Sequence, residues 1–261
     1  MDRRTQIARL AQSAEDEILL ARVYECITRA SQAGRPAASC FLSKREQMLC
    51  AELLRGERFR FFGGLESAER EVCCHVPEYL DEEDWLLGPD GPLAAVRAEF
   101  YEQDVLTHRD FLGSLMGCGV KRETVGDIYV RSGVCDFLVT RPILPYLLQN
   151  LTSAGRTKLR LRELPLSELE PPQAHSKTVR DTVSSLRLDS VVSSGFSISR
   201  GKAADYIAAG KAELNYLPCL KPDKSVAAAD VICVRGLGKI RLKEIGGATK
   251  KGRTAITIIR Y

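Results

Sequence analysis

The chain has 261 residues, 44% of them hydrophobic, and its 38 Lys and Arg against 34 Asp and Glu leave a net charge of +4. Such a chain can bury a sizeable core, and its length suits two or three domains. No run of about 18 apolar residues is present to cross a bilayer and the N-terminus lacks the apolar core of a signal peptide, so we expect a cytoplasmic protein without membrane insertion.

Residues 1–72 are expected to form a mainly helical domain. Apolar residues recur at helical spacing over residues 3–32, which predicts one or two helices. Ser43, followed three residues later by Glu46, has the arrangement of a capping box. A further helix is therefore expected to run from Ser43 to about Leu54.

Residues 73–170 are expected to form an α/β domain, preceded by a hairpin of two extended segments at 58–62 and 72–76. Its elements are expected, in chain order, as a strand (95–100), a helix (107–118), two strands (127–131 and 135–140), a helix (142–151) and a strand (158–164). This βαββαβ order is the split βαβ pattern. RNA-recognition (RRM) domains share it with many proteins that never bind RNA, so the order alone leaves RNA contact open.

An RRM domain stacks bases on aromatic side chains of its central strands. Phe137 is the only aromatic residue in the expected central strands of this domain that suits such a place. The aromatic and glycine pattern typical of a base-stacking strand is otherwise missing. The sequence therefore favours neither RNA contact nor its absence for the middle domain.

Nine cysteines are scattered along the chain without a Cys-x-x-Cys pair, and most lie in apolar runs. Free buried thiols in a reducing compartment are therefore expected. Cys73-Cys74-His75 contains residue types that bind metals, but neighbours on a strand point to opposite faces. No metal site is expected.

No catalytic site and no cofactor are expected either. The three histidines, at positions 75, 108 and 175, form no recognisable set with a nucleophile, and neither a Gly-x-Ser-x-Gly motif nor a Walker-type loop occurs. His108-Arg109-Asp110 matches the catalytic-loop triplet of protein kinases, but the other kinase signatures are absent. For His108 a local hydrogen bond at a helix start is favoured over direct RNA contact.

The last third of the chain is expected to hold two short helices followed by short strands. A first helix is predicted from Asp181 to Val192 and is ended by Gly195. Ser199 is a good N-cap residue, and the apolar spacing after it predicts a second helix that ends at Gly210. The alternating pattern that follows predicts strands joined by turns.

Positive charge is concentrated in this last part. From Asp181 to Tyr261 there are 14 Lys and Arg against 7 Asp and Glu, a net charge of +7, which leaves −3 for the first 180 residues. Arg200 and Lys202 lie on the first turn of the second helix, where backbone amides also favour an anion. Such a surface attracts the phosphates of nucleic acids, although a solvated lysine-rich surface would have the same composition.

This C-terminal sequence resembles the S-four (αL) RNA-binding domain, which occurs in a small-subunit ribosomal protein, tyrosyl-tRNA synthetases and bacterial pseudouridine synthases. The residues that match in order and spacing are Arg187-Leu188-Asp189, Ser197-Ile198-Ser199-Arg200, Ala203, Gly210-Lys211, Asn215, Lys221-Pro222 and Asp230. Tyr216 and Ala229 replace two glycines usual in that domain. The resemblance implies an RNA-binding domain over residues 180–261. Its candidate RNA contacts, several of which we expect to line one face, are Arg187, Ser199, Arg200, Lys202, Lys211, Asn215, Lys221, Lys239 and Arg241.

Two further stretches resemble the bacterial YlmH family, also called RqcP. They are residues 61–70 and residues 108–128, of which 108–116, 119–122 and 126–128 match. Members of the family combine a helical N-terminal part, an RRM-like middle domain and a C-terminal S-four domain. The resemblance therefore covers nearly the whole chain and implies an α+β fold. Further candidate RNA contacts in the second stretch are His108, Arg109, Lys121 and Arg122.

The YlmH resemblance implies a non-catalytic factor that binds rRNA of the large ribosomal subunit when that subunit carries a stalled peptidyl-tRNA. In that family the role is ribosome-associated quality control, in which the factor helps to hold the tRNA while an RqcH-type partner adds C-terminal alanines. The alternative is an RNA-modifying enzyme such as a pseudouridine synthase, but there the S-four domain usually precedes a large catalytic domain. The signatures of a tyrosyl-tRNA synthetase are absent, and an adaptor role in cell division has no sequence support of its own.

Overall fold

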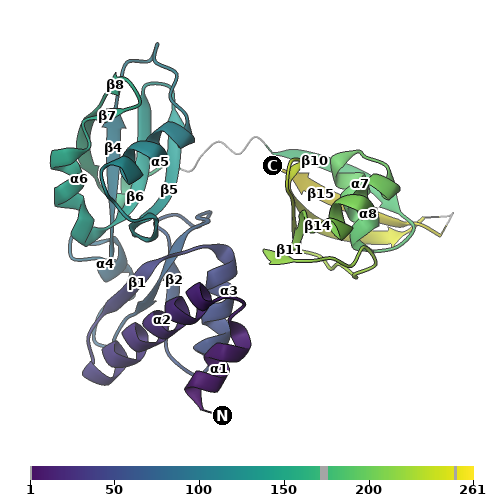
Figure 1. Ribbon diagram of the computed structural model, residues 1–261, viewed down its shortest axis with the longest axis horizontal. Coiled ribbons are helices and arrows are strands. Elements are labelled where there is room, and N and C mark those ends of the chain that lie inside the picture. The colour runs from purple at the N-terminus through teal and green to yellow at the C-terminus, as the bar shows by residue number, and fades with distance from the viewer. Residues whose placement is uncertain (1, 171–175, 250–251) are drawn as a thin grey trace. The chain divides into compact units, whose positions relative to one another are not determined.

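The computed structural model describes residues 2–170, 176–249 and 252–261, and it separates into two compact units, Met1–Pro172 and Gln173–Tyr261 (Figure 1). Both units contain helices and strands around buried cores, so the fold class is α+β, as expected. In the part of the chain that the structure describes, no helix is long and apolar enough to span a membrane.

The N-terminal part of the first unit contains three helices: α1 (Arg3–Leu10), α2 (Ala14–Ala33) and α3 (Lys44–Leu53). The Ser13 hydroxyl accepts a hydrogen bond from the backbone amide of Asp16 and so caps α2. At α3 the predicted capping box is confirmed, because Ser43 and Glu46 each accept a bond from the other's backbone amide.

Asp16 also connects α2 to α3. Its carboxylate accepts two hydrogen bonds from Arg45, at 2.8 and 2.7 Å, and one from the Gln12 amide, at 2.8 Å. The hydrogen bonds from Arg45, with smaller help from Gln12, outweigh the effect of burial and lower the pKa of Asp16 from 3.8 to about 2.

Asp16→Asn is expected to lower the free energy of unfolding near neutral pH by about 2 kcal/mol, because a carboxylate with a depressed folded-state pKa stabilises the folded protein above its unfolded pKa. This contribution is present above about pH 4 and is lost as the pH falls towards about 2, so parent and variant should converge over that range. Urea unfolding followed by the fluorescence of Trp85, which lies in the same unit, measures the difference. Exposed Glu15 is the control: Glu15→Gln should change the free energy by less than about 0.5 kcal/mol. A difference for Asp16→Asn that stays constant with pH would contradict the assignment.

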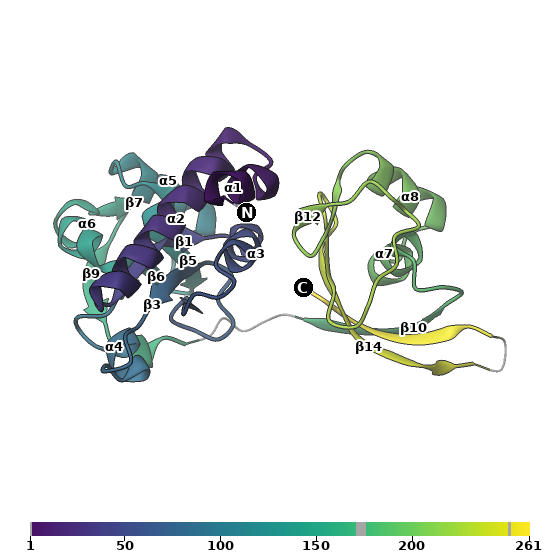
Figure 2. The same ribbon diagram turned by 90° about the horizontal axis from the view of Figure 1, so that it is seen from below.

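A three-stranded antiparallel sheet packs against α2 (Figure 2). Its strands are, in spatial order, β1 (Ala37–Leu42), β3 (Glu71–His75) and β2 (Arg60–Phe62). The expected hairpin is present as β2 and β3. The sequence does not predict β1, because residues 37–40 lack the β-branched and aromatic side chains typical of strands. Helices cover more than half of the first 72 residues, as expected, but β1 and β2 are part of the same segment, and the boundary expected between residues 72 and 73 falls inside β3.

The βαββαβ order expected for the middle of the chain is present. Its elements are β4 (Leu93–Glu99), α5 (His108–Gly117), β5 (Val125–Arg131), β6 (Val134–Thr140), α6 (Leu144–Asn150) and β9 (Arg160–Leu164). The strands form an antiparallel sheet in the order β5-β6-β4-β9, and α5 and α6 cover one face of it (Figure 1). The smaller elements of the unit are α4 (Glu82–Leu87), β7 (Ser153–Ala154), β8 (Thr157–Lys158) and the 3-10 turns η1 (Arg122–Thr124), η2 (Arg141–Ile143) and η3 (Leu166–Glu168).

Both faces of this middle sheet contribute to cores. Phe137 is fully buried in the core beneath α5 and α6, so it is not available to stack on a base. On the opposite face, Leu138 and Leu164 pack with Phe41 of β1 and Val72 of β3. That opposite face is the one on which RRM domains stack RNA bases. Here the chain's own N-terminal elements cover part of it.

Ion pairs occupy another part of the same face. Asp136 on β6 is fully buried and accepts two hydrogen bonds from Arg97 on β4, at 2.6 Å (Nε–Oδ1) and 2.7 Å (Nη2–Oδ2). Arg131 on β5 bonds the same carboxylate and also pairs with Glu170. One buried carboxylate thus holds an arginine from each of the two strands that flank β6.

The second unit contains β10 (Lys177–Val183), α7 (Leu188–Phe196), α8 (Arg200–Ala208), β11 (Ala212–Leu214), β12 (Leu217–Pro218), β13 (Val231–Val234), β14 (Gly238–Ala248) and β15 (Thr254–Arg260). The strands form one antiparallel sheet in the order β10-β15-β14-β13-β11-β12. The two helices pack on one face of this sheet, where Val192 and Ile207 join Ile240 and Ile258 in the core (Figure 1).

The helix predicted from Asp181 to Val192 is wrong in its first half. Residues 177–183 instead form β10, which pairs along its whole length with β15. Val179 and Val183 lie on the same side of this strand and pack against the core, but they are four residues apart, a spacing that also occurs on one face of a helix. The second predicted helix is present as α8.

At three positions of this unit, either the space for a side chain or the backbone conformation is one that suits glycine. Gly195 does not end the first helix but lies within α7, where an added Cβ would come within 2.5 Å of Ile240 Cδ1. The missing side chain lets α7 pack closely on β14. Tyr216 and Ala229 have φ values of 63° and 73°, so the left-handed turns persist where S-four domains usually have glycine.

Candidate nucleic-acid interface

Asp189 organises the corner between α7 and α8. Its side chain is 6% exposed, and its carboxylate accepts hydrogen bonds from Arg200, at 3.1 and 3.3 Å, and from Arg187, at 3.3 and 3.4 Å. The two arginines are 49% and 42% exposed. Each directs two of its five N–H groups to Asp189, so each has further donors for an acceptor outside the protein.

The charge of this corner is positive and fixed in place. Burial raises the pKa of Asp189, but the hydrogen bonds from Arg200 and Arg187 outweigh burial, and the net result is a pKa below the ordinary value. The carboxylate is therefore ionised at neutral pH, and its single charge offsets only one of two guanidinium charges. Oriented guanidinium groups with a net positive charge suit a phosphate, which they can bind with two parallel hydrogen bonds.

The start of α8 supplies Ser199, Arg200 and Lys202. Ser199 caps the helix as predicted, because its hydroxyl accepts a hydrogen bond of 3.3 Å from the backbone amide of Lys202. That bond gives Ser199 a structural role, while Arg200 and Lys202 are exposed. A groove of about 560 Å³ beside Arg200 is also lined by Ser197, which belongs to the S-four motif, and by Arg253 and four serines that no sequence motif singles out, Ser184, Ser190, Ser193 and Ser194.

The next three candidates differ in their surroundings. Lys211 and Lys221 are exposed, and the Lys211 ammonium lies 5.2 Å from the centre of the Tyr206 ring. Asn215 is instead held inside a turn: its Nδ2 donates to Asp230 at 2.8 Å, and its Oδ1 accepts from the amide of Val231 at 2.9 Å. Asn215 therefore stabilises the fold, and its side chain is occupied.

Lys239 and Arg241 do not lie on the face of Arg200, so the expectation of one shared face is wrong for them. Both lie on β14, where they alternate with Ile240 and Leu242, which pack towards the helices. Successive side chains of a strand point to opposite faces, so Lys239 and Arg241 lie on the side away from α7 and α8. The Lys239 ammonium lies 4.8 Å from the centre of the Tyr261 ring.

The four candidates of the middle domain lie in the first unit. His108 and Arg109 are exposed on the first turn of α5, which Thr107 and Asp110 cap. Lys121 is exposed just before η1. Arg122 is partly buried and donates hydrogen bonds from Nη1 to backbone carbonyl oxygens, at 2.5 Å and 3.4 Å. His108, Arg109 and Lys121 therefore extend from the surface, whereas Arg122 lines a groove.

The two stretches that resemble the YlmH family meet in the structure. The carboxylate of Asp127 accepts hydrogen bonds from the amides of Glu69 and Arg70, at 2.6 and 3.1 Å. Arg70 in turn donates to the carbonyl oxygens of Val125 and Phe41, both at 3.1 Å. The two stretches that resemble the family therefore lie in direct contact in the folded protein.

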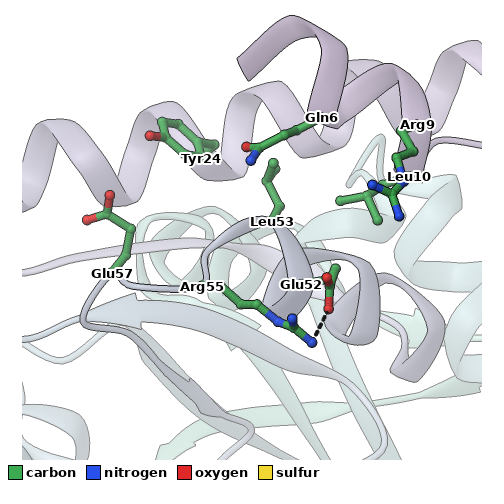
Figure 3. A pocket seen from close by; sticks show the side chains of 8 residues that line it. All are labelled: Gln6, Arg9, Leu10, Tyr24, Glu52, Leu53, Arg55 and Glu57. Atoms are coloured by element: carbon green, nitrogen blue, oxygen red, sulfur yellow. Dashed lines mark ion pairs between the residues drawn. The ribbon is translucent and has the colours of Figure 1, made fainter. Parts of the chain in front are cut away.

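A smaller pocket of about 350 Å³ lies among α1, α2 and the end of α3 (Figure 3). Figure 3 shows Arg9, Arg55, Glu52 and Glu57 around it, and Arg55 pairs with Glu52 at 2.7 Å. Cations and carboxylates are balanced in this lining, so it does not select an anion such as phosphate.

Over residues 2–170, 176–249 and 252–261, no group of three or more His, Cys, Asp and Glu is arranged to hold a metal ion. Cys50, Cys73, Cys74 and Cys135 are free and buried, as expected, whereas the other five cysteines are only partly buried. Burial raises the pKa of the Cys50 thiol to about 12, and it also raises the pKa values of Cys73, Cys74 and Cys135. These thiols are protonated at neutral pH and are poor nucleophiles or metal ligands.

Comparisons with known proteins agree with this architecture. Residues 99–168 match the family model described as "Putative RNA-binding domain in YlmH". A protein of Bacillus subtilis (strain 168) named ribosome-associated protein quality control protein P2 is 33% identical over 224 residues, which cover 84% of this chain and 85% of that protein. The solved structure of the cell division protein ylmH from Streptococcus pneumoniae covers 62% of this chain and 98% of its own, with a TM-score of 0.51 and 19% identity, and so shows a shared fold. By its similarity to the Bacillus subtilis protein over most of both sequences, the chain belongs to the YlmH family.

Proposed function

We propose that this protein is a non-catalytic RNA-binding factor of ribosome-associated quality control. It binds rRNA of the large ribosomal subunit together with a stalled peptidyl-tRNA, and it supports the addition of C-terminal alanines by an RqcH-type partner. It acts by binding and positioning, without making or breaking bonds. Because ribosomes are cytoplasmic, the proposal implies a cytoplasmic location.

The observation that carries the proposal is the arginine pair held by Asp189. Arg187 and Arg200 are half exposed, oriented by a buried carboxylate and adjacent to exposed Lys202, in the most basic part of the chain. This arrangement is typical of a phosphate-binding surface. The name of the Bacillus subtilis relative supports a role in ribosome-associated quality control, and the family model supports RNA binding by the middle domain.

Replacing Arg200 and Lys202 together by alanine is expected to weaken binding to large ribosomal subunits about tenfold and to reduce its salt dependence by about one to two phosphate contacts. Co-sedimentation with purified large subunits over a range of salt concentrations measures both effects. The same variant should shorten or remove alanine tails in an extract that contains the RqcH-type factor.

Arg156 and Lys158 provide a matched control, because they are exposed and have the same Arg-x-Lys spacing on the β7–β8 turn of the other unit. Changing both to alanine removes the same charge and should alter binding less than twofold. We call the corner between α7 and α8, with Arg187, Asp189, Arg200 and Lys202, the helix corner. If the protein with Arg200→Ala and Lys202→Ala sediments like the parent at every salt concentration, the helix corner is not the RNA-binding surface.

A further inference from the structure

A second basic site lies in the first unit, in a groove of about 770 Å³ lined by residues of α2, β1, α3, α5 and η1. Its charged lining residues are Arg22, Glu46, Arg70, Lys121, Arg122 and Glu123. Both stretches that resemble the YlmH family contribute to this lining. The helix corner of the second unit does not use either stretch.

The charges of the groove do not cancel. Arg22 and Glu123 neutralise each other through two contacts, at 3.1 and 3.3 Å. Glu46 accepts a hydrogen bond from the Ser43 amide in the capping box of α3. This leaves three cations, those of Arg70, Lys121 and Arg122, against the single charge of Glu46. Nearby Asp127 directs its carboxylate to the amides of residues 69 and 70 and to the Tyr129 hydroxyl.

Arg70 and Arg122 are held together by one acceptor, the carbonyl oxygen of Val125, which lies 3.1 Å from Arg70 Nε and 2.5 Å from Arg122 Nη1. A carbonyl oxygen carries only partial charge, so it orients two like-charged groups without neutralising them. Burial, together with the charge of Arg70, lowers the pKa of Arg122 to about 10, and burial also lowers the pKa of Arg70. The charges of Glu46 and Asp127 oppose this shift at Arg70, and the charge of Asp127 opposes it at Arg122, but neither reverses it.

We propose that this groove binds a phosphate group of an RNA backbone between the Arg70–Arg122 pair and Lys121. That the phosphate belongs to RNA rests on the proposed RNA-binding function. Each guanidinium group offers a planar set of donors that suits the oxygens of a phosphate. Phe41 is the aromatic residue among the described lining residues, and it is buried, so the lining offers no exposed ring to stack on a base. This favours a backbone phosphate over a free nucleotide, whose base is usually held in an apolar or aromatic pocket.

The test uses the full chain and a fluorescein-labelled single-stranded RNA, with binding measured by anisotropy over a range of salt concentrations. Lys121→Glu is the main variant, because Lys121 is exposed and its change should leave the fold intact. It should weaken binding about fivefold to tenfold and reduce the salt dependence by about one phosphate contact. Lys158→Glu, the same charge change on β8, should weaken it less than twofold. Arg122→Lys keeps the positive charge but loses the forked guanidinium group, so its affinity for RNA should lie between those of Lys121→Glu and the parent.

The measurement is repeated in the background of Arg200→Ala and Lys202→Ala. If the two sites are independent, Lys121→Glu should lower the affinity for RNA by the same factor in both backgrounds. If Lys121→Glu binds RNA as Lys158→Glu does, the groove proposal is wrong, whatever the helix corner contributes. If Lys121→Glu weakens binding while the helix-corner variant does not, the proposed RNA-binding surface of the second unit fails and the groove remains. ATP serves as the competitor. If ATP binding depends on Lys121 while Lys121→Glu leaves RNA binding unchanged, the groove binds a free nucleotide and the RNA assignment is wrong.

Discussion

Asp136→Ala is expected to lower the free energy of unfolding of the first unit by about 3–5 kcal/mol, because removing one partner of a buried ion pair leaves the other charges uncompensated. Asp136 is fully buried and holds Arg97 and Arg131, which are only 18% and 29% exposed. Both guanidinium groups would remain next to each other, and the exposed carboxylate of Glu170 would pair only with Arg131. The Nε of Arg131 is already buried without a hydrogen-bond partner among the described residues.

Urea unfolding followed by Trp85 fluorescence measures this loss, because Trp85 packs against the apolar core on the same face of the sheet. Glu163→Ala is the matched control. Glu163 pairs with Arg141 at 2.9 Å but is 46% exposed, so its loss should cost less than about 1 kcal/mol. A destabilisation by Asp136→Ala as small as that of Glu163→Ala would show that the two arginines do not depend on Asp136.

Asp189→Ala is expected to weaken binding to large ribosomal subunits about tenfold, although it makes the protein more positive by one charge. If charge alone determined affinity, removing a carboxylate would strengthen binding. The structure favours the opposite result, because Asp189 holds Arg187 and Arg200 in fixed directions. Without it, both side chains lose their orientation and must be ordered again on binding, at a cost of about 0.5–1.5 kcal/mol for each side chain.

Asp205→Ala provides the control for charge, because Asp205 is exposed on α8 and its removal makes the same change in net charge. This variant should bind large subunits as well as the parent or better. Co-sedimentation compares the two, and Asp189→Asn, which keeps the size of the side chain, replaces the alanine variant if that variant does not fold. Stronger binding by both Asp189 variants would show that orientation of the arginines does not matter.

Elements whose signals are local could be predicted from the sequence. Ser43 and Glu46 predict the start of α3, and Ser199 predicts the start of α8, because a cap depends only on neighbouring residues. By contrast, β10 is a strand because β15 pairs with it, more than 70 residues further along the chain. Its two core-facing residues, Val179 and Val183, are four residues apart, and this spacing fits one face of a helix as well as one face of a strand.

In the candidate site, too, some features could be predicted from the sequence and others depend on the folded structure. The sequence identifies Arg187 and Arg200 by motif, and the structure adds that a buried Asp189 holds both. Which face Lys239 occupies depends on the register of β14, and this register follows from the pairing of Ile240 and Leu242 with other strands. The groove of the first unit could not be predicted, because Arg70 and Arg122 meet only through the carbonyl oxygen of Val125.

The shared core of the two sheets in the first unit limits how this protein can be divided. Phe41, Val72, Leu138 and Leu164 pack together, so a fragment that begins at residue 73 would leave the apolar face of the middle sheet open to water. Such a fragment would be prone to aggregate and would display a sheet face that the intact protein covers. RNA bound by it would therefore report on an artificial surface. A fragment that preserves the middle domain as it occurs in the protein must keep both sheets, whose strands lie between residues 37 and 164.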